Sequence, residues 1–115
     1  MEPRERAAYH KAGHQIAALK GRREDPLIDV LVRYGGFAAE ALRVDDESCI
    51  PLLMSVETDF QEARKTILDH FVTADESRSS TGRVEDYIVS FWLMTKQRLG
   101  IHWAAVVRLA KQRMN

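Results

Sequence analysis

Apolar residues recur every three or four positions over most of this chain, which is the spacing of one face of an α-helix. The first such segment follows Pro3, which suits a first helical turn, and it continues to Lys20 before Gly21 supplies a stop. His10 and His14 lie on a different face of this predicted helix, among small residues. We therefore expect another element to approach closely beside the two histidines. The apolar stripe itself consists of Ala8, Ala12, Ile16 and Leu19.

A second helix is expected to follow a charged connection. Asp25 and Pro26 fit an N-cap and a first helical turn, although residues 27–32 would equally fit a short buried strand. We favour the helix. The pair Gly35-Gly36 is expected to interrupt it, because glycine is a poor helix former, and residues 37–42 are then expected to form helix again. An acidic loop should come next, over residues 44–51.

Three further helices complete the predicted fold. One begins near residue 55, one covers residues 84–99 and is closed by Gly100, and a last one starts near Trp103. The pattern predicts a mostly helical, single domain of residues 1–115. Its parts are site-bearing helices in residues 1–72, a linker rich in serine and charge at 73–82, and a C-terminal helical pair at 83–115. The apolar positions of the first of these helices are Val56, Phe60, Ala63, Ile67 and Phe71.

Composition indicates a soluble, cytoplasmic protein. The chain has 115 residues, 45% hydrophobic and 30% charged, with 17 basic and 17 acidic side chains, so no net field favours nucleic acid or an anionic membrane. Cys49 is the single cysteine, and no signal peptide or membrane span is present. Basic side chains are concentrated in residues 1–23 and 93–115, and we expect these two ends to tie the fold together rather than to bind a polyanion.

His10 and His14 are the most informative residues for chemistry. Histidines four positions apart project from one face of a helix and can bind one metal ion. Alone, this spacing is weak, because two histidines can also bond backbone carbonyls or face water. A zinc site needs a third ligand, commonly a carboxylate or histidine from another helix. Lys11 stands where the zinc-protease motif H-E-x-x-H has its glutamate, which acts as the general base.

Three segments together resemble the peptidase unit of the FtsH-type ATP-dependent zinc metalloproteases. Residues 8–19 are similar to the family pattern A-Y-H-E-A-G-H-A followed by apolar residues, except at Lys11. Residues 34–42 are similar to L-x-G-G-R-A-A-E-E, and residues 56–63 to G-A-x-N-D-[IL]-x-x-A. The segments occur in the family's order, and the resemblance covers about residues 4–72.

The resemblance implies a zinc ion bound by His10, His14 and Asp59, in a fold like the FtsH peptidase unit with its central strands trimmed. It does not imply activity, because Lys11 occupies the base position. We therefore expect a metallopeptidase-like protein with impaired or absent peptide hydrolysis, which binds a peptide or protein partner. The chain has no ATP site, and a homo-oligomer is suggested by family analogy alone.

Two alternatives follow from the same residues. Glu40, Glu57 or Glu62 could replace the missing base and leave an active metalloendopeptidase, but the sequence places none of them beside a bound water. Alternatively, the chain is a metal-free helical interaction domain that kept the scaffold and lost the chemistry.

Overall fold

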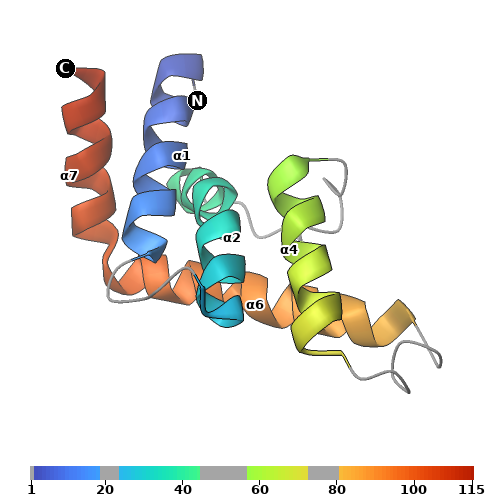
Figure 1. Cartoon of the computed structure of the whole chain (residues 1–115). Helices are drawn as coiled ribbons and strands as arrows, with labels where there is room; N and C mark the ends of the chain where they lie inside the picture. Colours follow the sequence, from blue (N-terminus) through green and yellow to red (C-terminus); the bar gives the residue numbers. More distant parts are fainter. Residues whose placement is uncertain (1, 19–23, 45–56, 73–80) are drawn as a thin grey trace.

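The computed structural model describes residues 2–18, 24–44, 57–72 and 81–115, with the side chains of residues 81–83 excepted (Figure 1). Within these residues the chain forms helices and no strand, which confirms the prediction of a mostly helical fold. The strand alternative for residues 27–32 is wrong, because a helix covers them. In chain order the helices are α1 (Pro3–Ala17), α2 (Pro26–Arg43), α4 (Thr58–His70), α6 (Thr81–Ile101) and α7 (Trp103–Met114).

Helix α2 begins as its sequence predicts. The side chain of Asp25 accepts a hydrogen bond of 2.9 Å from the backbone N–H of Leu27, and Pro26 occupies the first turn. The predicted interruption at Gly35-Gly36 is wrong, since α2 runs through both glycines without a break. Two interior glycines cost a helix about 1 kcal/mol each relative to alanine. Packing against α1 must offset this cost.

The glycines allow the backbones of α1 and α2 to touch. A Cβ atom added to Gly35 would lie 2.6 Å from the carbonyl oxygen of Gly13, and one added to Gly13 would overlap the carbonyl oxygen of Gly35. A Cβ atom at Gly36 would lie 2.5 Å from Nε2 of His10. The close approach expected beside the histidines is therefore present, and α2 is the element that makes it.

Helices α6 and α7 pack against the first two helices. In Figure 1, α1 and α7 stand side by side at one end of the long helix α6, while α2 lies between α1 and α4. The core beneath them is aromatic: Trp92 of α6 is 1% exposed, and its ring centroid lies 6.0 Å from that of Tyr34 and 6.3 Å from that of Phe60. These contacts fix α2 and α4 on α6.

Several predicted boundaries move or lie outside the described residues. Helix α6 continues through Gly100 to Ile101, and Thr81 and Gly82 belong to this helix rather than to the linker. The described part of α1 ends at Ala17, whereas its prediction extended to Lys20. Residues 19–23, 45–56 and 73–80, which include Cys49, most of the acidic loop and most of the linker, are outside the described residues. Among the helices of the described segments, none is long and apolar enough to cross a membrane.

Candidate metal centre

The three residues predicted as metal ligands come together between α1, α2 and α4. His10 and His14 lie one turn apart on α1, and Asp59 lies in the first turn of α4. One ligand atom from each residue can be chosen so that all three lie within 4.8 Å of one another. The side chains are 26%, 28% and 31% exposed, respectively, so solvent reaches the site.

The two separations that involve His14 match the edges of a zinc tetrahedron. Nε2 of His14 is 3.0 Å from Nε2 of His10 and 3.4 Å from Oδ2 of Asp59. Zinc binds nitrogen and carboxylate oxygen at about 2.0–2.1 Å, so two ligands of a tetrahedral ion are separated by about 3.3 Å. Both separations lie within about 0.3 Å of that value.

Hydrogen bonds at Nδ1 hold both imidazoles, and their Nε2 atoms lie close together. Nδ1 of His14 is 2.5 Å from the carbonyl oxygen of Val32, and Nδ1 of His10 is 2.8 Å from Oε2 of Glu40. A carbonyl and a carboxylate accept hydrogen bonds, so each Nδ1 carries the proton as donor. In neutral rings of this tautomer both Nε2 atoms carry a lone pair, and these two atoms lie 3.0 Å apart. A cation between the two Nε2 atoms, either a metal ion or a proton shared by the rings, would stabilise this arrangement.

Asp59 is oriented by Arg33 of α2. Nη1 of Arg33 is 3.8 Å from Oδ1 of Asp59, which leaves Oδ2 on the side of His14. The guanidinium is itself held by Asp29, whose Oδ2 is 3.0 Å from Nε of Arg33 and accepts a 3.0 Å hydrogen bond from the hydroxyl of Thr66. A positive side chain behind a carboxylate ligand fixes its direction without occupying the ligand position.

Helix α2 therefore supports all three candidate ligands while contributing none itself. Sequence reasoning missed Val32 and Arg33 in this role. A signal existed for Arg33, since Asp29 and Arg33 are spaced as an i,i+4 ion pair on a helix. None existed for Val32, because its contribution is a backbone oxygen.

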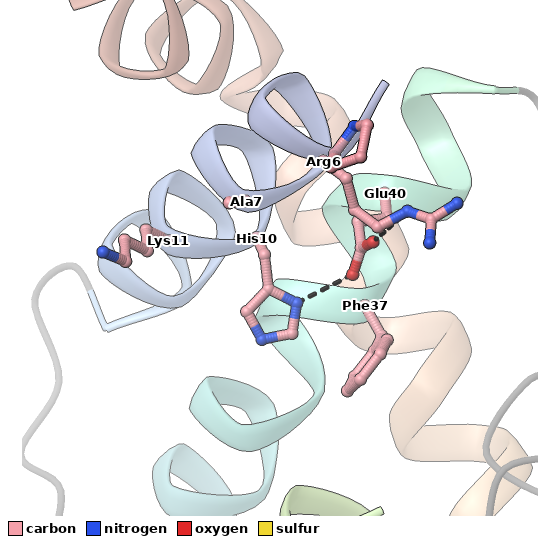
Figure 2. Close-up of a pocket in the computed structure, with 7 residues that line it drawn as sticks. Arg6, Ala7, His10, Lys11, Phe37 and Glu40 are labelled. Atoms are coloured by element: carbon pink, nitrogen blue, oxygen red, sulfur yellow. Dashed lines mark hydrogen bonds and ion pairs between the residues drawn. The ribbon is translucent and has the colours of Figure 1, made fainter. Parts of the chain in front are cut away.

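Glu40, which the sequence offered as a substitute base, lies behind His10 (Figure 2). Its side chain is 14% exposed, with Oε2 on Nδ1 of His10 and Oε1 3.3 Å from Nε of Arg6. This position orients the imidazole and is on the opposite side of the ring from Nε2. Of the other two candidates, Glu57 is the N-cap residue of α4 and Glu62 is exposed on that helix.

Lys11 is exposed and points away from the pair formed by His10 and Glu40, as Figure 2 shows. A pocket of about 380 Å³ adjoins the site on this side of α1, and the ring of His10 forms part of its wall. Pro3, Ala7 and Phe37 give the pocket a mainly apolar surface, and the charged residues Arg6, Lys11 and Glu40 also line it. The pocket therefore offers room for an apolar group next to the candidate ligands.

No family model matches the chain, and no curated protein or solved structure matches it. The resemblance to FtsH-type peptidases thus rests on the three motifs alone.

Proposed function

We propose that this protein binds one zinc ion through Nε2 of His10, Nε2 of His14 and Oδ2 of Asp59, in a peptidase-like site that hydrolyses peptides poorly or not at all. The observation that carries the proposal is the pair of Nε2 atoms 3.0 Å apart, with Oδ2 of Asp59 3.4 Å from that of His14 and each ring held by a contact at Nδ1. Two imidazoles and a carboxylate are a common ligand set for catalytic zinc.

Three protein ligands leave the fourth position of a tetrahedral ion for water. Zinc lowers the pKa of such a water to near neutrality, which supplies a nucleophile and polarises a carbonyl. A peptidase also needs a base to take the proton of this water, and that step is typically worth about 10²–10⁴ in rate. With Lys11 turned away and Glu40 bonded to Nδ1 of His10, neither side chain is placed for the task.

Peptide binding without efficient cleavage is the outcome that fits these residues. The mainly apolar pocket beside His10 is suited to a side chain of a bound peptide, and the order of the three motifs resembles that of a peptide-cleaving family. The substrate class is part of the proposal and rests on this resemblance.

Zinc content and zinc affinity test the proposal directly. We expect purified protein to take up one zinc ion per chain, measured by metal analysis and by calorimetric titration. His14→Ala and Asp59→Asn should each lose stoichiometric binding. His70→Ala is the matched control, since His70 is an exposed histidine on α4 that is not part of the site. Wild-type protein that folds but takes up no zinc would overturn the proposal.

A metal-free interaction domain is the second candidate, and a specific observation favours it. Charges at the site have partners without any ion, because Arg33 lies by Asp59, Arg6 lies by Glu40, and a proton on one ring would satisfy both imidazoles. Thermal melting with and without a chelator separates the candidates. A ligand that binds the native state raises Tm by mass action, so equal melting temperatures would support the metal-free reading.

A further inference from the structure

The two basic ends of the chain lie against each other on the outside of α1. Helices α1 and α7 pack side by side, and a pocket of about 320 Å³ opens between them. Arg4 and Lys11 of α1 and Arg113 of α7 line this pocket with Ala7 and Ala8, and none of the described residues that line it is acidic. Its volume falls in the range of about 300–1,000 Å³ that is usual for small-ligand sites.

In the described part of the chain, the hydrogen-bond acceptors of the two pocket arginines carry no negative charge. Arg4 donates to the carbonyl oxygen of Met114, and Arg113 donates to Oε1 of Gln15 at 3.1 Å; both acceptors are neutral. Within the described residues, no carboxylate forms an ion pair with Arg4, Lys11 or Arg113. Elsewhere in these residues arginines do pair with carboxylates, as Arg43 does with Glu5 at 2.8 Å.

Helix dipoles do not remove this excess. The pocket lies near the N-terminal turns of α1, whose dipole contributes about +0.5 charge, and near the end of α7, which contributes about −0.5. These partial charges offset each other, so the field of three cationic side chains remains. Guanidinium groups also present paired N–H donors that match the oxygens of phosphate in geometry.

We propose that the pocket between α1 and α7 binds a phosphate-class oxyanion through Arg4, Lys11 and Arg113. Two of these groups come from arginines whose neutral contacts hold them along α1, and the third is a flexible ammonium that closes on the ligand. The proposal assigns a function to Lys11. This side chain is not a ligand of the candidate metal centre, and it lines the pocket between α1 and α7. The proposal does not depend on zinc binding.

Titration with inorganic pyrophosphate tests the site. The protein is kept in chelator, so that the anion cannot coordinate zinc, and binding is followed by calorimetry and by backbone amide shifts. We expect saturable binding with shifts concentrated in α1 and the end of α7. Lys11→Gln and Arg113→Gln should each weaken binding by about fivefold to tenfold, and Lys11→Arg should restore it. Arg108→Gln is the matched control, because Arg108 is exposed on α7 and does not line the pocket.

The control should change the affinity by less than about twofold. An equal loss in Arg108→Gln and Lys11→Gln, or no saturable binding by folded wild-type protein, would overturn the proposal. Vesicles of phosphatidylglycerol and of phosphatidylcholine distinguish the source of the oxyanion. Lys11-dependent binding to the former but not the latter would assign the site to a lipid headgroup, and Lys11-dependent binding of pyrophosphate alone would assign it to a soluble phosphate.

Discussion

The two faces of α1 differ in how their polar side chains are held. On the inner face, His10 and His14 each have a hydrogen-bond partner on α2, and the two backbones are so close that only glycine fits at Gly13 and Gly35. On the outer face, Lys11 is exposed, as are Arg4 and Arg113, and none of the three has a carboxylate partner within the described residues. Directed binding of a small cation requires the first arrangement, whereas attraction of an anion needs only the second.

Substituting Lys11 by glutamate should give the largest effect, because it acts on both faces. Position 11 also lines the pocket that contains the ring of His10, so a carboxylate there restores the base of H-E-x-x-H, and we expect casein hydrolysis by the zinc-loaded variant to rise by about 10²-fold or more. The same change should abolish pyrophosphate binding. His14→Ala in the Lys11→Glu background is the control and should return hydrolysis to baseline. A folded, zinc-loaded Lys11→Glu protein with unchanged hydrolysis would contradict the role assigned to this position.

A methyl group added at the contact between α1 and α2 should have the next largest effect. Gly13→Ala places a methyl group against the carbonyl of Gly35 and 2.6 Å from Cβ of Ala39. Overpacking of this kind costs about 1–3 kcal/mol, and we expect the free energy of unfolding in urea to fall by about 2 kcal/mol. Gly100→Ala is the matched helical control, since its Cβ meets nothing within 4 Å, and it should raise stability by up to about 1 kcal/mol. Equal stability of the two variants would show that the contact is looser than described.

Removing the carboxylate that contacts Nδ1 of His10 tests whether the orientation of this ring matters for metal binding. Glu40→Ala leaves all three candidate ligands in place but frees the imidazole, and groups in this position typically change metal affinity by about 10–100-fold. We expect a loss of this size in a competitive zinc titration. Glu62→Ala, which removes an exposed carboxylate of α4, should have no effect. Loss of the same size in both variants would point to net charge instead of orientation.

A smaller, pH-dependent effect is expected from the packed core next to the site. Burial raises the pKa of Tyr34 above its ordinary value of about 10, with Arg64 acting weakly in the opposite direction. The phenol stays neutral in the folded state, so its contribution is fully present below pH 10 and is lost above it, at no more than about 1.4 kcal/mol per pH unit. Urea melts from pH 9 to 11 should show a shallower loss in Tyr34→Phe than in Tyr87→Phe, whose phenol is partly exposed. Identical slopes would contradict this assignment.

Helical periodicity was sufficient to predict the elements, because each buried stripe recurs at the spacing of a helix face, as Val84, Ile88 and Phe91 do in α6. It failed at Gly35-Gly36, where local propensity favours a break and contact with Gly13, more than twenty residues away, decides otherwise. Long-range contacts of this kind are not encoded in any single segment.

The candidate ligands were predictable from motifs, but their supports were not. The His10, His14 and Asp59 set follows from spacing and resemblance, whereas the partner of His14 is the backbone carbonyl of Val32. The expectation that the basic ends tie the fold together holds for Arg6, which pairs with Glu40. Arg4 and Arg113 also join α1 to α7, but through neutral acceptors instead of carboxylates.

Asp59 stands on a different helix from the two histidines, and α4 is separated from α1 by most of the first half of the chain. An ion bound by all three residues would therefore cross-link two helices that are far apart in sequence. Loss of the ion would leave the close contact between α1 and α2 at their glycines intact. It would first loosen the first turn of α4. Hydrogen exchange at the amides of that turn would then report occupancy of the centre more sensitively than global melting does.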